Sequence, residues 1–272
     1  MRNPIIILLV IAAPVAAHAQ VVFPADSAYR PLRCGNMPMT DGLADTAGFL
    51  DDLDVVGDPA AAAGLRASDA TNLYLRIRLE ADPVSGTLQA STWGMEFNLD
   101  IDTTNYELLV LVDGIAAPPV VSIFTNTMTT LSNDPNDPAD MPAVQSYPFG
   151  MNGRSVAASG SNFGGDGDFF LDFAVPWSEL VPLGLDRDTS TRAWVASSAS
   201  QNSLNGDFAC HDPANGAVSL GNSVSDTTTG DPNEDTTGGT GRLEGGGGCA
   251  VSGNAGLLVL ALFGLLRKRR AR

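Results

Sequence analysis

The sequence predicts an all-β protein whose main part is a single antiparallel β-sandwich. Several segments alternate apolar and polar residues, which is typical of strands that place one face on a core. Turn signals such as Asp82-Pro83 and Asp113-Gly114 separate these segments. Between the two ends of the chain, no stretch of ten or more residues repeats apolar residues at the helical period. Short strands joined by such turns are typical of antiparallel sandwiches.

At the N-terminus, residues 1–19 predict a secretory signal peptide. Arg2 gives a positively charged start, Ile5 to Ala13 form an apolar core, and Ala17-His18-Ala19 is a small-x-small cleavage site. A buried N-terminal helix is the alternative, and it is disfavoured because two prolines bracket the apolar run. Cleavage between Ala19 and Gln20 would export the chain through the secretion machinery.

The sandwich domain is expected over residues 20–218. Its clearest strand alternates four apolar residues with Tyr74, Arg76, Arg78 and Glu80, so one face should meet the core and the other solvent. The segments 20–48 and 125–153 contain several prolines and are expected to be irregular. The further expected elements are strands from Trp93 to Leu99, Tyr106 to Val112, Val120 to Phe124, Phe169 to Val175 and Arg192 to Ser197, and a helical turn from Trp177 to Leu180.

Beyond the domain, residues 219–248 consist mainly of Asp, Thr, Gly, Asn and Pro. This composition cannot build a core and predicts a flexible linker. Residues 249–272 begin with Cys249, continue with an apolar run from Ala255 to Leu266 and end in a basic cluster. The run predicts a transmembrane helix, although it is short against the roughly 20 residues of a comfortable span. The basic residues would stay cytoplasmic and leave the domain outside the inner membrane.

The chain is strongly acidic, with 31 acidic and 15 basic residues and a net charge of −16. Six of the basic residues lie at the two ends, so the domain itself is more acidic still. Such a surface repels nucleic acid and anionic lipid, and neither is an expected partner. The charge suits solubility and cation binding.

Three cysteines are present. Cys34 and Cys210 lie near the two ends of the domain, and an exported domain can form disulfides, so we expect a Cys34–Cys210 bridge. Two free thiols are the alternative, because sequence alone does not prove pairing. Cys249 follows four glycines, which points to processing or lipidation rather than to folding.

The glycines before Cys249, the apolar run after it and the basic cluster from Arg267 to Arg270 form a three-part tail. This tail resembles the C-terminal sorting signals of Gram-negative bacteria, especially the cysteine-containing kinds named MYXO-CTERM and JDVT-CTERM. The resemblance implies that an intramembrane protease cuts near Cys249, which would be the residue of processing or lipidation. It also implies a transient stay in the inner membrane before transfer to the cell surface or release.

Asp41-Gly42, the run from Ser68 to Leu75 and the segment from Phe169 to Leu180 carry a second resemblance. Together they are similar to the sandwich superfamily that includes family 9 carbohydrate-binding modules and DOMON-like domains. The resemblance implies a jelly-roll-like sandwich. For the carbohydrate-binding branch it also implies glycan binding and a structural calcium.

The domain offers little for catalysis. After signal cleavage its single histidine is His211, beside Cys210, so no multi-histidine zinc site can form. Glu96 and Glu107 fall on adjacent expected strands, which makes a hydrolase with two carboxylates the alternative function. In the expected register, however, Glu96 points to solvent, where a cross-strand arginine is the ordinary explanation for it.

Aspartates in loops predict calcium ligands, because calcium prefers hard oxygen donors. The candidates are Asp100, Asp102, Asp166 and Asp168, and residues 51–54 add a further acidic cluster. None of them matches the helix-flanked calcium loop. Aspartate is also common in turns for backbone reasons alone, so Ca²⁺ is an optional cofactor rather than a required one.

Exposed aromatic rings can stack on sugars. Tyr74 lies on the polar face of the clearest strand together with Arg76 and Arg78, and these three are the candidate glycan-binding residues. An exposed tyrosine that shields an arginine stem is the alternative explanation. The tryptophans lie in or beside expected strands, where core packing is their usual role.

These features predict an exported, surface-sorted, non-catalytic binding or structural module, with an extracellular glycan as the expected ligand class. An extracellular polysaccharide hydrolase that uses paired carboxylates is the alternative. A purely structural envelope protein is a third hypothesis.

Overall fold

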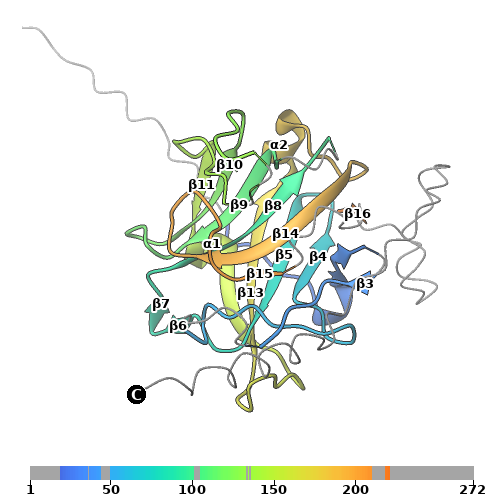
Figure 1. Ribbon diagram of the computed structural model, residues 1–272, viewed down its shortest axis with the longest axis vertical. Coiled ribbons are helices and arrows are strands. Elements are labelled where there is room, and N and C mark those ends of the chain that lie inside the picture. Colours follow the sequence, from blue (N-terminus) through green and yellow to red (C-terminus); the bar gives the residue numbers. More distant parts are fainter. Residues whose placement is uncertain are drawn as a thin grey trace, which may run out of the picture. The chain divides into compact units, whose positions relative to one another are not determined.

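The structure is a computed structural model that describes residues 19–35, 37–43, 50–100, 105–132, 134, 136–209 and 218–220. All of these belong to the first of two compact units, Met1–Asp235, and the second unit, Thr236–Arg272, lies outside the described residues. The described part is mostly β-structure in antiparallel sheets, which confirms the all-β prediction (Figure 1).

One sheet is built around the strand with the clearest alternation. Its five strands lie in the order β1 (Arg30–Pro31), β4 (Gly64–Ser68), β5 (Asn72–Leu79), β13 (Phe169–Pro176) and β12 (Gly153–Ala157). β5 occupies the centre and pairs with β13 along its whole length, so that Leu75 lies opposite Phe173. Both side chains are fully buried.

The other large sheet has seven strands. Six follow the order β11 (Gln145–Pro148), β10 (Val120–Thr125), β9 (Leu108–Asp113), β8 (Thr92–Asn98), β14 (Ser190–Ser198) and β15 (Phe208–Ala209), and β16 (Val218–Ser219) also pairs with β14. β9 is apolar on both faces, and all of its residues are buried because segments outside the sheet cover the face that points away from the core.

The remaining elements are short. Two small hairpins pair β2 (Arg33–Cys34) with β3 (Met37–Pro38), and β6 (Val84–Ser85) with β7 (Thr87–Leu88). The helical elements are η1 (Asp26–Ala28), α1 (Phe149–Asn152), α2 (Trp177–Leu180) and η2 (Val181–Leu183). Among the described residues, no helix is long and apolar enough to cross a membrane. The predicted signal peptide up to His18 and the predicted tail lie outside the part that the structure describes.

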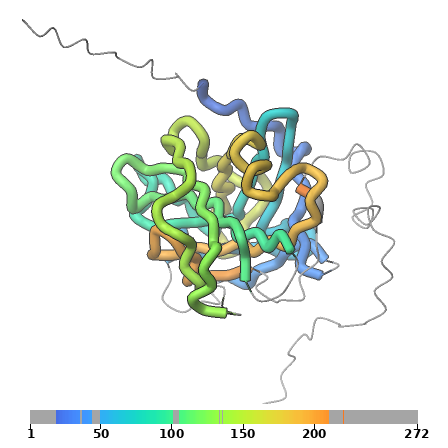
Figure 2. Tube along the Cα trace, turned by 90° about the horizontal axis from the view of Figure 1, so that it is seen from above, coloured from blue at the N-terminus to red at the C-terminus, as the bar shows by residue number. Residues whose placement is uncertain are grey.

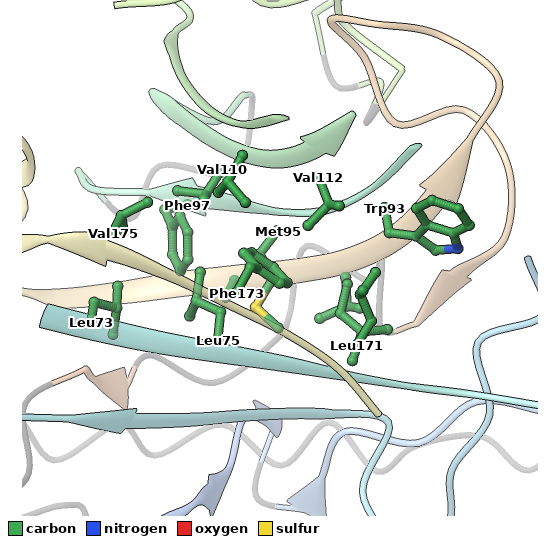
Figure 3. Packing of buried hydrophobic residues seen from close by; sticks show 14 of the residues in the cluster. Leu73, Leu75, Trp93, Met95, Phe97, Val110, Val112, Leu171, Phe173 and Val175 are labelled. Carbon is green, nitrogen blue, oxygen red and sulfur yellow. The ribbon is translucent and has the colours of Figure 1, made fainter. Parts of the chain in front are cut away.

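Both large sheets contribute side chains to one hydrophobic core. Figure 3 shows Leu75 and Phe173 of the five-stranded sheet near Met95 and Val110 of the seven-stranded sheet, and all four belong to the same buried cluster. The sheets also approach closely at β4. A Cβ added to Gly64 would lie 2.7 Å from Cγ2 of Val195 in β14. Removing these apolar faces from water is the main favourable term for this arrangement.

Each large sheet also buries residues on its other face. On the seven-stranded sheet, Leu109 and Trp194 form a separate cluster with Ala139 and Leu204, which come from segments outside the strands. The predicted solvent exposure of this face, including Glu96, is therefore wrong. Covering this face is favourable because Leu109 and Leu111 are apolar at positions that point away from the core.

The five-stranded sheet has a similar cover. Its Tyr74 packs in a small cluster with Tyr29, Val21 and Phe23 of the N-terminal segment. This segment, residues 19–31, is blue in Figure 2 and runs along the outside of the domain. The polar face of β5 is thus not a solvent face.

The long predicted strands are confirmed, each within two residues at either end. The helical turn from Trp177 to Leu180 is confirmed as well. The segment 125–153, expected to be irregular, contains β11 and α1. These were hidden from sequence reasoning because β11 is an edge strand of four residues that depends on pairing with β10.

Candidate functional site

The three residues predicted to bind glycan lie on one face of β5, but they are buried. The exposed fractions of Tyr74, Arg76 and Arg78 are 3%, 1% and 6%. The N-terminal segment covers them because its aromatic residues pack on this face. The prediction that Tyr74, Arg76 and Arg78 form an open surface for a sugar is therefore wrong, because all three side chains are buried.

Arg76 is held by an ion-pair network instead. Its Nε and Nη2 donate to the Asp172 carboxylate at 2.6 and 3.0 Å. The guanidinium group lies over the rings of Tyr29 and Phe170, at 3.8 and 4.2 Å from their centroids. Arg154 also donates to Asp172, at 2.8 Å. The guanidinium group of Arg76 is thus engaged in contacts within the fold rather than with a ligand.

Tyr74 remains a candidate because it lines a pocket. The pocket has a volume of about 350 Å³ and lies where the start of β5 meets β11, α1 and the N-terminal segment. Pockets for small ligands usually begin near this size, at roughly 300 Å³. Residues 19–22 and Pro176 form part of its wall, and its polar lining residues are Asp69, Thr71, Asn72, Tyr74, Tyr147 and Asn152.

Asp69 organises the polar side of this pocket. Its Oδ1 accepts hydrogen bonds from the backbone N–H groups of Thr71 and Asn72 at 2.7 and 2.8 Å. Its Oδ2 accepts from the Tyr74 hydroxyl at 2.6 Å. Burial alone would raise the pKa of Asp69, but these hydrogen bonds and the charge of Arg187 outweigh it and hold the pKa below its usual value.

The two tyrosines in the pocket stay protonated at neutral pH. Burial, followed by the hydrogen bond to Asp69, raises the pKa of Tyr74. Burial, followed by the charge of Glu179, raises the pKa of Tyr147 to about 12. The lining therefore contains an ionised carboxylate, two phenols, the Thr71 hydroxyl and the side-chain amides of Gln20, Asn72 and Asn152, and these groups suit a ligand with several hydroxyl groups.

The N-terminal segment is tied to the wall of this pocket. Gln20 Nε2 donates to the Gly150 carbonyl at 3.2 Å, and the Val21 N–H donates to the Met151 carbonyl at 3.0 Å. Both Ala19 and Gln20 line the pocket, so the predicted signal cleavage site lies at its edge. Sequence reasoning missed the pocket because its residues come from four segments that are far apart in the chain.

The predicted catalytic pair does not form an open site. Glu96 has no exposed surface, and burial raises its pKa well above the usual value, with further contributions from Asp137 and Asp134. Glu107 is half-buried, and its Oε2 accepts a hydrogen bond from the Leu99 N–H at 2.6 Å. A polymer could reach Glu96 only after the cover over this face had moved.

The predicted calcium ligands are not brought together. Asp100 and Asp166 are exposed, and Asp102 lies outside the described residues. Asp168 is buried and accepts hydrogen bonds from the Phe163 N–H and the Ser161 hydroxyl. Within the described ranges, no three His, Cys, Asp or Glu residues are close enough to hold a metal ion.

Of the three cysteines, only Cys34 lies within the described residues. Cys34 forms a disulfide. Cys210, its predicted partner, lies outside the described residues, as do His211 and Cys249. The Cys34–Cys210 pairing and the processing role of Cys249 stay predictions.

Comparison with protein-family models gave no match, and neither curated proteins nor solved structures gave one. Function is therefore inferred from the residues of the chain and their arrangement. The two family resemblances remain predictions from sequence.

Proposed function

We propose that this chain is an exported, surface-sorted module without catalytic activity that binds an extracellular glycan. We also infer that its two large sheets face each other as a jelly-roll-like β-sandwich, because they share one core. The observation that carries the glycan proposal is the pocket beside β5. Export would use the secretion machinery, and an intramembrane protease acting near Cys249 would release the module from its tail.

The lining of the pocket suits a sugar. Sugar hydroxyls donate and accept hydrogen bonds, and Asp69, Asn72 and Asn152 offer partners of both kinds. Tyr74 and Tyr147 also line the pocket, but both side chains are almost fully buried, so the polar lining rather than an aromatic platform supports the proposal. A volume of about 350 Å³ accommodates a small group, such as the end or a branch of a polysaccharide, rather than a long segment.

Binding is better supported than hydrolysis. Both carboxylates of a glycosidase must reach the scissile bond. Glu96 is fully buried, and the Glu107 carboxylate already accepts a hydrogen bond from the Leu99 N–H. In the pocket, Asp69 is engaged by three hydrogen bonds, an arrangement that fixes a turn and orients Tyr74.

A thermal-melt screen of the purified mature protein against soluble polysaccharides tests the proposal. A ligand of the pocket should raise the melting temperature because it binds the folded state alone. Asp69→Asn should weaken or abolish this shift. The amide keeps the shape of the side chain but replaces one acceptor oxygen by a donor and removes the charge.

Asp186→Asn is the matched control. Asp186 also accepts hydrogen bonds from two backbone N–H groups and one hydroxyl, in an exposed turn, but it does not line the pocket. The control should keep the shift. If no polysaccharide in the panel shifts the melting temperature, glycan binding is rejected for that panel and the purely structural hypothesis gains. An equal loss in both variants would place the ligand elsewhere.

A further inference from the structure

Glu96 lies at the middle of β8, on the face of the seven-stranded sheet that points away from the core. Its neighbours in sequence, Met95 and Phe97, belong to the core. Across the sheet Glu96 lies opposite Leu109 of β9 and Trp194 of β14, which both belong to the apolar cluster on this face. Glu96 has no exposed surface. A carboxyl group is thus enclosed in an apolar layer.

The described residues do not compensate a charge on this carboxyl group. Neither oxygen of Glu96 has a hydrogen-bond partner among them. The charges that act on Glu96 are those of Asp137 and Asp134, and both are negative. Burial without a partner strongly disfavours the charged form of a carboxyl group. Glu96 is therefore a neutral, protonated acid in this closed conformation.

The other ionisable groups on this face do not change that conclusion. Burial raises the pKa of Tyr106, which precedes β9, so its hydroxyl stays neutral. The Glu107 carboxylate already accepts a backbone N–H at 2.6 Å. Arg192 of β14 lies opposite Asn98, at the end of β8, rather than opposite Glu96. A charge on Glu96 would thus meet mainly negative or neutral groups.

The segment from Asn126 to Val144 is the cover of this face, and it buries little apolar surface. In its described part, only Ala139 belongs to the buried cluster, and Ala143 packs against that cluster. The exposed large apolar side chains of the cover are Met128, Leu131, Met141 and Val144. A segment with few buried apolar contacts opens at a low free-energy cost. The cover can therefore open while the rest of the fold stays intact.

Asp137 organises the described part of the cover. Its Oδ1 accepts hydrogen bonds from the Thr130 and Leu131 N–H groups at 2.8 and 2.6 Å. Its Oδ2 accepts from Asn126 Nδ2 at 2.9 Å. Three donated hydrogen bonds stabilise a negative charge on this carboxylate. A second negative charge, on Glu96, would therefore repel the residue that holds the cover together.

We propose that Glu96 is a proton-controlled latch for the cover. While Glu96 carries its proton, the cover stays closed over the seven-stranded sheet. When the proton leaves, the new charge needs water and is repelled by Asp137 and Asp134, and opening of the cover supplies both the water and the distance. The latch is separate from the pocket beside β5, so this proposal and the glycan proposal can fail independently.

The latch opens as the pH rises. Under an open cover Glu96 is solvated, and the pKa of a solvated glutamate is about 4.3. In the closed conformation, burial and then the charges of Asp137 and Asp134 raise the pKa of Glu96 well above that value. The closed state is therefore fully favoured below about pH 4. Its preference over the open state falls by up to about tenfold per pH unit as the pH rises towards the pKa of the closed state.

Amide hydrogen exchange of the mature protein and of Glu96→Gln, followed by mass spectrometry at pH 5 and pH 8, tests the proposal. Comparing the two proteins at the same pH cancels the chemical exchange rate. At pH 8, amides of the cover should exchange at least about tenfold faster in the wild type, because the glutamine cannot ionise. At pH 5 this ratio should be much smaller. Amides of β5, in the other large sheet, should exchange alike in both proteins.

Glu80→Gln is the matched control. Glu80, beside β5, is another glutamate whose pKa is raised, to about 7, and its replacement should leave the faster exchange of the cover at pH 8 unchanged. Glu96→Leu guards against a glutamine variant that merely fails to fold, because leucine suits the apolar layer and should keep the cover closed at both pH values. Equal exchange of the cover in the wild type and both Glu96 variants at pH 8 would overturn the proposal. So would a pH-dependent loss of protection that extends equally to β5, because it would show global unfolding rather than a latch.

Discussion

Glu80 directly follows β5, and its pKa is strongly raised. Burial, a side-chain hydrogen bond to Asp54 and the charges of Asp51, Asp54 and Asp168 raise the pKa of Glu80 to about 7. The charges of residues 51–54 and of Asp168 thus both act on Glu80, although within the described residues they do not form a metal-binding group. What the sequence shows as separate acidic clusters is one electrostatic neighbourhood in the fold.

Glu80 should make the protein less stable as the pH rises. In the unfolded chain its pKa is near 4.3, so between about pH 4 and pH 7 the folded state holds a proton that the unfolded state releases. The stabilisation that Glu80 contributes is fully present below the pKa of the unfolded state. It is lost as the pH rises through the folded pKa of about 7. Glu80→Gln stays neutral and should gain stability relative to the wild type at pH 8 but not at pH 4.

Urea unfolding of both proteins from pH 4 to pH 8 measures this difference. Asp188→Asn, in an exposed turn, controls for the loss of one negative charge. A constant difference between Glu80→Gln and the wild type across the range would show that Glu80 titrates as an ordinary exposed carboxylate.

At the scale of elements, the network around Asp172 joins four parts of the fold. Asp172 belongs to β13, Arg76 to β5 and Arg154 to β12, and the N-terminal segment contributes Asp26, which pairs with Arg76 Nη1 at 2.9 Å. Asp172 and Arg76 are almost completely buried. Burial favours loss of the Arg76 charge, but the hydrogen bonds and charge of Asp172 outweigh it, so the pKa of Arg76 is raised.

Removing Asp172 should therefore destabilise the sheet strongly. Asp172→Ala leaves the buried Arg76 guanidinium without its main counter-charge and should lower the free energy of unfolding by about 3–5 kcal/mol. Chemical denaturation measures it, with Asp172→Asn as a milder variant if the alanine variant does not fold. Arg154→Met is the comparison, because Arg154 is partly exposed and should cost about 1 kcal/mol or less. Equal costs would mean that the network contributes little.

At the scale of the whole molecule, the contact between the two large sheets decides the fold. Gly64 allows this contact to be tested, since an added Cβ there would lie 2.7 Å from Val195 Cγ2 in the other large sheet. Gly64→Ala should destabilise by about 1–3 kcal/mol through overpacking. Gly150→Ala is the control, because an added Cβ at Gly150 has no heavy atom within 4 Å.

The double variant Gly64→Ala with Val195→Ala should recover part of this cost, because the smaller residue at 195 makes room for the new methyl group. A double-mutant cycle in urea should give a coupling energy of about 0.5–3 kcal/mol. Additive effects, or a cost no larger than that of the control, would contradict a sandwich in which the sheets face each other at this point.

Most of the secondary structure could be predicted from the sequence because it depends on local pattern. The alternation in β5 and β13 and the apolar run of β9 mark strands wherever they occur. The candidate site could not be predicted in this way. The pocket joins Asp69 to Tyr147 and Asn152, which no spacing in the chain brings together.

The sequence by itself determined that this is a β-protein, where its long strands lie and which residues of each strand share a face. It also carries the predictions of export and sorting, through ends that lie outside the described residues. Only the tertiary structure decided which faces are covered. Alternation shows that a strand has two faces but not what packs on the second one. That depends on segments such as 19–31 and 126–144, which have no periodic apolar pattern. Some of their residues, such as Tyr29 and Ala139, are buried only when the folded sheets present a surface for them.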